Sequence, residues 1–291
     1  MNRKSPFCQW SRAKNIFPYL FLCYNKGTDF CFRKDFLMNK KYFFFDIDGT
    51  LGLGISSIIP ADTLYCLHRL EQEGHFIAIA SGRLQHDTQT FADRYNIPAV
   101  VADGGNSLSL NGKILEMTGL PLENCKALLH DVAKRGLPWA VVTDNTINRY
   151  TPYDTFPHAD PRNYMKTVVK PVDIDGLTAV YKIMYARPDK DEAEPPQHGL
   201  PHLEYIDHTY LIEPTDKSRG ILRMLELVGG RPEDAVVFGD GMNDISMFRK
   251  PFLSIAMGNA RDELKAHADY ITGDNDKGGI LQACKHFGWL G

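Results

Sequence analysis

The sequence predicts an α/β protein whose core is a doubly wound, Rossmann-like parallel sheet, with an α+β segment inserted into it. Apolar runs of strand length alternate with helical patterns before residue 103 and again after residue 215. That alternation is typical of parallel strands joined by crossover helices. Between the two stretches the rhythm changes to a hairpin, one long helix and strands separated by polar loops. The return of the first rhythm indicates an insertion into one sheet domain.

The first part of the predicted sheet contains three strands and two helices. Tyr42–Ile47 is an apolar, aromatic run with an acidic residue near its end, which is typical of a buried parallel strand. A helix is predicted at Pro60–Glu73, because its leucines recur at helical spacing and Gly74 follows as a helix stop signal. The elements expected next are a strand at His75–Ala80, a helix at Leu84–Tyr95 and a strand at Ala99–Ala102.

The inserted segment, which we call the cap, is predicted to be about 95 residues long, within the size range of a domain. The change of rhythm begins with a hairpin at Asn106–Met117 with Asn111-Gly112 at its turn. The elements expected next are a helix at Leu122–Arg135, strands at Trp139–Thr143, Thr178–Ala186 and Leu203–Ile212, and loops at Tyr150–Asp175 and Lys190–Pro201. We expect the core to span 38–112 and 210–291, and the cap 113–209.

After Thr215 the alternating rhythm resumes and completes the sheet. The expected elements are helices at Ser218–Leu227, Asp244–Arg249 and Arg261–Ala268, and strands at Ala235–Phe238 and Leu253–Ala256.

Residues 1–37 form an N-terminal extension that lacks a steady helical or strand period. Its longest apolar stretch, Ile16–Tyr24, is interrupted by Pro18, and no small-residue cleavage site of a secretory signal follows it. We expect that translation starts at Met38 or that the extension is disordered, with a targeting segment as the alternative. The extension is left out of the fold prediction.

Composition and charge narrow the function classes. With 43% hydrophobic and 24% charged residues, the chain has the composition of an ordinary globular enzyme. Residues 1–37 contain seven Lys/Arg and two Asp, net +5, so the rest carries −8 of the overall −3. This negative net charge of residues 38–291 argues against nucleic-acid binding. No apolar run reaches the roughly 18 residues of a membrane span. The six cysteines form no metal-binding pair, which favours reduced thiols in the cytoplasm.

Three polar residues follow predicted strands, so distant segments can converge on one site. Ligands of open α/β sheets bind beyond the carboxyl ends of the strands. Asp46, Ser81 and Asp240 all lie at or just after such ends. Strand alternation also puts Asp46 and Asp48 on the same side if extended geometry continues.

Four short stretches in fixed order carry the chemistry: Phe45-Asp46-Ile47-Asp48-Gly49-Thr50, Ala80-Ser81-Gly82-Arg83, Lys217, and Gly239-Asp240-Gly241-Met242-Asn243-Asp244. Together they supply a pair of carboxylates, a hydroxyl, an ammonium and a second carboxylate cluster, which are the parts needed to hold Mg²⁺ and a phosphoryl group. Singly, Ser81-Gly82-Arg83 also fits a plain helix N-cap, and Lys217 fits a solvated helix start. Their order and placement after strands favour a joint site.

This set resembles the haloacid dehalogenase (HAD) superfamily and, within it, the Cof-type Mg-dependent sugar-phosphate phosphatases, over about residues 42–291. The resemblance implies that Asp46 is the nucleophile and that Asp48 protonates the leaving group and then activates water. It implies a Mg²⁺ cofactor held by Asp46, the backbone carbonyl of Asp48, and Asp240. Asp244 would support the metal's water ligands or orient Lys217.

The resemblance also implies a phosphate-binding set. Ser81, Gly82, Lys217 and Asn243 would bind the phosphoryl oxygens as negative charge spreads over them. One departure from the usual Cof-type sequence is Asp103-Gly104-Gly105-Asn106 after the third strand, where relatives often carry Asn-Gly.

The resemblance implies hydrolysis of small phosphomonoesters, most of all sugar phosphates, by a cytoplasmic monomer or weak dimer. The expected partner is a small phosphorylated metabolite, with no nucleic acid and no membrane. The cap residues Asp144, Asn148, Arg149 and Tyr150 could read the sugar or form a solvated loop. The alternatives are a phosphomutase of the phosphomannomutase type and a non-catalytic binding protein on the same fold.

Overall fold

A computed structural model describes residues 40–54, 58–154, 156, 164–187, 193–205 and 208–290. By backbone proximity the chain from Lys40 onward forms one unit. The predictions for residues 1–37 fall outside the described residues. In the part that is described, no helix combines the length and apolar character needed to cross a bilayer.

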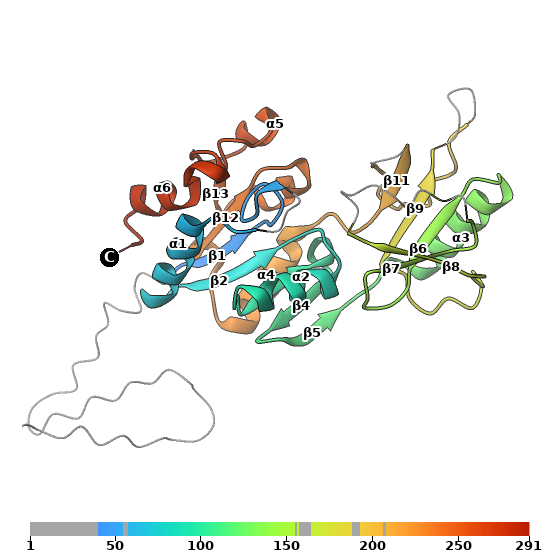
Figure 1. Ribbon diagram of the computed structural model, residues 1–291, viewed down its shortest axis with the longest axis horizontal. Helices are drawn as coiled ribbons and strands as arrows, with labels where there is room; N and C mark the ends of the chain where they lie inside the picture. The colour runs from blue at the N-terminus through green and yellow to red at the C-terminus, as the bar shows by residue number, and fades with distance from the viewer. Residues whose placement is uncertain are drawn as a thin grey trace, which may run out of the picture. The chain divides into compact units, whose positions relative to one another are not determined.

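The larger sheet has eight strands (Figure 1). From edge to edge they are β14 (Tyr270–Ile271), β13 (Leu253–Ala256), β12 (Ala235–Gly239), β1 (Tyr42–Phe45), β2 (Phe76–Ala80), β3 (Ala99–Ala102), β4 (Ser107–Leu110) and β5 (Lys113–Met117). The first six are parallel, and β4 and β5 form an antiparallel hairpin at the edge. The chain thus has the predicted doubly wound α/β core.

Helices cover the larger sheet, and all except the two that follow β14 lie between its strands in the chain. They are α1 (Ala61–Gln72), α2 (Gln85–Arg94), α4 (Lys217–Val228), α5 (Asp262–Lys265) and α6 (Gly279–His286), with the 3₁₀ helices η3 (Asp103–Gly105), η4 (Pro232–Asp234), η5 (Met242–Met247) and η6 (Asn275–Lys277). Strand β1 lies at the centre of the core, and its Phe43, Phe44 and Phe45 are fully buried. This explains the aromatic run in the sequence, since a central parallel strand has both faces covered.

The smaller sheet has six strands and belongs to the inserted segment. Their order is β10 (Leu203–Glu204), β11 (Thr209–Ile212), β9 (Lys182–Ala186), β6 (Trp139–Val142), β7 (Asn148–Thr151) and β8 (Lys166–Val169). All neighbours are antiparallel except β7 and β8. Helix α3 (Leu122–Lys134) packs on β6, and its buried leucines share a core with that strand (Figure 1).

Some predicted elements differ from the structure. The single strand expected at Leu203–Ile212 is instead the antiparallel pair β10 and β11, in which Leu203 lies opposite Leu211. Strands β7 and β8 occupy part of the segment around Tyr150–Asp175 that was predicted as loops; they exist because each pairs with the other. The expected helix at Asp244–Arg249 is the earlier 3₁₀ helix η5.

The division into core and cap stays a prediction. Strand β5 pairs with β4 in the eight-stranded sheet, so sheet membership would move the first boundary from residue 112 to after Met117. Strand β11 pairs with β9 in the six-stranded sheet, so sheet membership would move the second boundary from residue 209 to after Ile212.

Candidate active site

Asp46 and Asp240 lie side by side because they end neighbouring strands. Asp46 follows β1, Asp240 follows β12, and Phe45 pairs with Phe238 in the parallel register. From β1 the chain crosses to β2 on one side, whereas β12 lies on the other side. The two aspartates therefore stand at the topological switch point, where open α/β sheets bind ligands.

Three carboxylates converge there. One oxygen each of Asp46, Asp240 and Asp244 lies within 4.8 Å of the others. The buried ammonium of Lys217 contacts two of them, at 2.6 Å from Asp46 Oδ1 and 2.5 Å from Asp244 Oδ1. The Thr50 hydroxyl donates to Asp240 Oδ1 at 3.0 Å. The structure thus brings the predicted metal ligands Asp46, Asp240 and Asp244 together with the predicted phosphate ligand Lys217.

The charges in this cluster do not balance. Burial, and then repulsion by Asp244, raises the pKa of Asp46 well above its usual value, against the opposing effect of Lys217. Burial and the same repulsion raise the pKa of Asp240 to about 7. Burial alone would lower the pKa of Lys217, but Asp244 and Asp46 outweigh it and raise that pKa. One ammonium against three carboxylates leaves a negative excess, and an all-oxygen donor set of this kind suits a hard divalent cation.

Backbone contacts hold the cluster in place. Asp244 Oδ2 accepts from the amides of Asp240 and Gly241, at 2.9 and 3.0 Å. Gly49 has a φ of +82°, and a Cβ there would lie 2.2 Å from Asp240 Oδ2. The glycine after Asp48 is thus needed both for its backbone conformation and for the close approach of Asp240.

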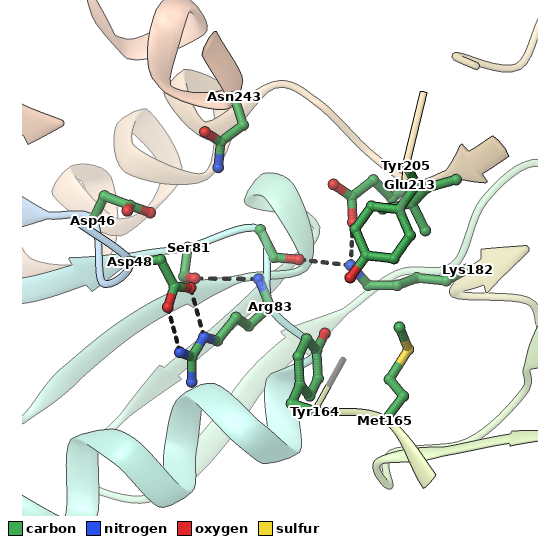
Figure 2. Close-up of a pocket in the computed structure, with 12 residues that line it drawn as sticks. Asp46, Asp48, Ser81, Arg83, Tyr164, Met165, Lys182, Tyr205, Glu213 and Asn243 are labelled. Atoms are coloured by element: carbon green, nitrogen blue, oxygen red, sulfur yellow. Dashed lines mark hydrogen bonds and ion pairs between the residues drawn. The ribbon is translucent and has the colours of Figure 1, made fainter. Parts of the chain in front are cut away.

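The Asp48 side chain is not one of the three clustered carboxylates. It forms a two-point ion pair with Arg83, with Nε–Oδ2 at 2.8 Å and Nη2–Oδ1 at 2.5 Å (Figure 2). Arg83 also pairs with Asp87 at 2.9 Å. The sequence analysis did not predict this pair, although Arg83 ends the motif stretch Ala80-Ser81-Gly82-Arg83. The Asp48 side chain is 41% exposed and borders the cavity described next.

A cavity of about 120 Å³ opens beside the cluster. On the side of the larger sheet it is lined by Asp46, Asp48, Ser81, Gly82, Arg83 and Asn243. Figure 2 shows the Asn243 amide opposite Ser81, across the space next to Asp46. The predicted site residues Ser81, Gly82 and Asn243 therefore share one cavity with both aspartates of the first motif.

The other wall comes from strands of the smaller sheet and the residues next to them. It consists of Tyr164, Met165, Lys182, Tyr205, Leu211 and Glu213. No motif in the sequence marked these residues, because they are scattered over some fifty positions and meet only in the fold. Among the described residues, Asp144, Asn148, Arg149 and Tyr150 are not part of this lining; Tyr150 instead donates to Asp144 at 2.6 Å.

Comparison with known families gives one match over most of the chain. A sequence profile described as haloacid dehalogenase-like hydrolase matches residues 43–284. The matched region includes all four motif stretches.

Individual proteins that are similar to most of this chain are phosphatases. The chain is 25% identical over 268 residues to the 5-amino-6-(5-phospho-D-ribitylamino)uracil phosphatase YwtE of Bacillus subtilis, covering 81% of this chain and 93% of that protein. It is 27% identical over 259 residues to the putative phosphatase YkrA of the same organism, covering 87% and 100%. Among solved structures, the HAD subclass IIB sugar phosphatase BT4131 superposes with a TM-score of 0.68 at 28% identity, covering 86% of this chain and 100% of that one.

Proposed function

Since the chain belongs to the haloacid dehalogenase-like hydrolase family, we propose that it hydrolyses small phosphomonoesters, sugar phosphates above all, with Mg²⁺ and through an aspartyl-phosphate. It is a phosphatase of that family. One observation supports the proposal of a Mg²⁺-dependent reaction through an aspartyl-phosphate. A buried carboxylate, Asp46, borders the cavity and is clustered with two further carboxylates and a buried lysine.

Asp46 is the proposed nucleophile. Its carboxylate oxygen attacks phosphorus, and the bond between phosphorus and the leaving oxygen breaks. Lys217, 2.6 Å from Asp46 Oδ1, offsets part of the repulsion between two anions and binds a phosphoryl oxygen. The hydroxyl of Ser81 and the amide of Asn243 bind other phosphoryl oxygens, and Gly82 leaves room for the backbone to approach them.

Asp48 is the proposed acid and base. It gives its proton to the leaving oxygen, and it then takes a proton from the water that attacks phosphorus and releases Asp46. Its partial exposure and its place at the cavity suit this role, because the group must exchange a proton with the substrate and with water. Arg83 sets the direction of its carboxylate.

Asp46, Asp240 and Asp244 would hold the metal, with the backbone carbonyl of Asp48 as a further ligand. A bound Mg²⁺ supplies the positive charge that lets a carboxylate approach an anionic phosphate. The negative excess of the cluster supports this assignment, since a cation would stabilise it.

The cavity and the relatives support the substrate class. A cavity of about 120 Å³ closed on one side by the inserted segment suits a small leaving group rather than a protein or a nucleic acid. The phosphoribityl chain in the name of YwtE and the sugar phosphatase description of BT4131 point to phosphorylated polyols and sugars.

Phosphate release from a panel of sugar phosphates, phosphoribityl compounds and a generic aryl phosphate tests the proposal, with Mg²⁺ and with EDTA. We expect metal-dependent release that is fastest for one sugar or polyol phosphate. An isomerised sugar phosphate without free phosphate would contradict hydrolysis, and equal rates in EDTA would contradict the metal.

A further inference from the structure

A lysine of the smaller sheet contacts the loop that carries Ser81. Lys182, the first residue of β9, donates from Nζ to the carbonyl oxygen of Gly82 at 2.7 Å, across 100 positions of sequence. The same ammonium forms an ion pair with Glu213, the residue that follows β11. Both side chains are nearly enclosed, at 3% and 11% exposure. Figure 2 shows the two contacts meeting at the Lys182 nitrogen.

The carbonyl of Gly82 is part of the peptide group that ends in the amide of Arg83. That amide donates to the Ser81 hydroxyl oxygen at 3.2 Å. The peptide group is planar, so its oxygen and its N–H point in opposite directions. Lys182 binds the Gly82 oxygen and Ser81 binds the Arg83 N–H, so the two side chains hold the Gly82–Arg83 peptide plane from opposite ends.

The direction of this peptide group determines how the Ser81 hydroxyl is used. The Ser81 oxygen accepts one hydrogen bond from Arg83, which leaves its own O–H free to turn elsewhere. Because Ser81 lines the cavity beside Asp46, that O–H can donate into the cavity. A rotated peptide would withdraw the Arg83 N–H and release the hydroxyl from this orientation.

A second contact reaches the same loop from the inserted segment. The Tyr164 hydroxyl accepts from the backbone amide of Leu84 at 2.9 Å. Two side chains of the inserted segment, Lys182 and Tyr164, thus bond to consecutive parts of the loop after β2.

A buried lysine needs a partner, because an isolated buried charge is costly. Glu213 supplies it. The next residue, Pro214, packs its carbonyl against Gly104, where a Cβ would lie only 1.9 Å away. The position of Glu213 is therefore set by close backbone packing on η3, and Lys182 is held between a fixed carboxylate and the Gly82 carbonyl.

We propose that Lys182 is a positioning residue of this phosphatase, acting through the Gly82–Arg83 peptide to direct the Ser81 hydroxyl at the phosphoryl group, with Glu213 holding its ammonium in place. The inference rests on the proposed function, in which Ser81 binds a phosphoryl oxygen.

A double-mutant cycle tests it. The four proteins are the wild type, Lys182→Met, Ser81→Ala and the combination of both. Each is assayed for hydrolysis of the best phosphomonoester and, separately, for binding of inorganic phosphate in Mg²⁺ by calorimetry. We expect Lys182→Met to lower kcat about 10- to 100-fold, since small misplacements of catalytic groups cost that much. In the Ser81→Ala background the same change should cost less than twofold, because Lys182 acts through Ser81. If the losses of the two single variants multiply in the double variant, both in kcat and in phosphate affinity, the inference is overturned.

Two further variants separate positioning from folding. Lys182→Met leaves Glu213 buried without its partner, so the melting temperature should fall. Lys182→Met combined with Glu213→Gln removes both charges and should recover that temperature, while kcat stays low. A double variant whose kcat returns to within twofold of the wild type would overturn the inference. Lys166→Met, at the first and exposed position of β8, is the matched control and should change neither readout.

The two proposals can fail separately. A wild type that releases no phosphate from any phosphomonoester contradicts the proposed function. Phosphate binding that is independent of Lys182 contradicts this inference alone.

Discussion

Arg83 binds Asp48 at two points, through Nε and Nη2, and uses its third nitrogen, Nη1, to bind Asp87. The Arg83 side chain is 11% exposed, whereas the Asp48 side chain is 41% exposed. A nearly buried guanidinium therefore orients a carboxylate that faces the cavity, and α2 in turn anchors the guanidinium through Asp87.

This arrangement makes arginine specific at position 83. A lysine keeps the charge but presents no planar fork, so it cannot hold both oxygens of Asp48 in one plane. We expect Arg83→Lys to lower kcat about tenfold with little change in melting temperature. Steady-state kinetics measures this, with Arg94→Lys on the exposed end of α2 as the control. Wild-type kcat in Arg83→Lys would contradict an orienting role.

The nucleophile assignment predicts a complete loss of turnover on removing one charge. Asp46→Asn keeps the shape of the side chain but removes the attacking oxygen anion, so kcat should fall at least about 1,000-fold. The variant should still unfold cooperatively, because one of three mutually repelling carboxylates has become neutral. Asp262→Asn changes a carboxylate that is 98% exposed and should keep full activity. More than a few per cent of wild-type turnover in Asp46→Asn would remove the assignment.

The metal assignment predicts that Asp240 controls the response to Mg²⁺. Asp240→Asn weakens one ligand and lowers the negative excess of the cluster, so half-maximal activity should need about tenfold more Mg²⁺. A Mg²⁺ titration after EDTA treatment measures the shift. An unchanged titration curve would mean that Asp240 is not a ligand.

At Gly104 the chain that leaves strand β11 of the smaller sheet packs against the larger sheet's η3. It has a φ of +57°, and a Cβ there would lie 1.9 Å from the Pro214 carbonyl oxygen. Gly136 has a φ of +70° and open space around it. Both Gly→Ala variants pay the backbone cost of about 1–2 kcal/mol, but only Gly104→Ala adds a backbone clash, for a total above about 3 kcal/mol. Chemical denaturation of both variants tests this, and equal losses would contradict it.

Asp103 predicts a pH effect on stability. Burial raises its pKa to about 6, and its Oδ1 has no hydrogen-bond partner among the described residues. A raised carboxyl pKa means that the folded state holds the proton more tightly than the unfolded state. This contribution is therefore complete below about pH 4 and is lost as the pH rises to about 6, amounting to about 3 kcal/mol.

Asp103→Asn should remove that loss, since an amide does not ionise and asparagine tolerates the residue's φ of +48°. The free energy of unfolding of the variant relative to the wild type should thus rise between pH 4.5 and pH 7.5. Urea denaturation at the two pH values measures it, with Asp262→Asn as the control. A difference that does not depend on pH would contradict the prediction.

Much of the core could be predicted because its signals are local. Strands β3 and β13 have the predicted bounds, since each is a short apolar run between breaking residues. Strands β7 and β8 could not be predicted, because their mixed, partly exposed residues form strands only through pairing with neighbouring strands, β7 with β6 and β8, and β8 with β7. The sequence predicts one strand where β10 and β11 form a hairpin, because no glycine or proline marks a turn between Glu204 and Thr209.

The order of residues along the chain is enough to show which chemical groups stand at the ends of the strands. Asp46, Ser81 and Asp240 each follow an apolar run, and the parallel sheet rule brings such ends to one edge. Which partners those groups contact follows from the folded arrangement of distant segments. The pairing of Arg83 with Asp48 depends on side-chain geometry, and the contact of Lys182 with Gly82 joins positions 100 residues apart. Local patterns record burial and turns, whereas the Arg83–Asp48 pair depends on how the loops after β1 and β2 meet. The Lys182–Gly82 contact depends on how the smaller sheet packs against the loop after β2.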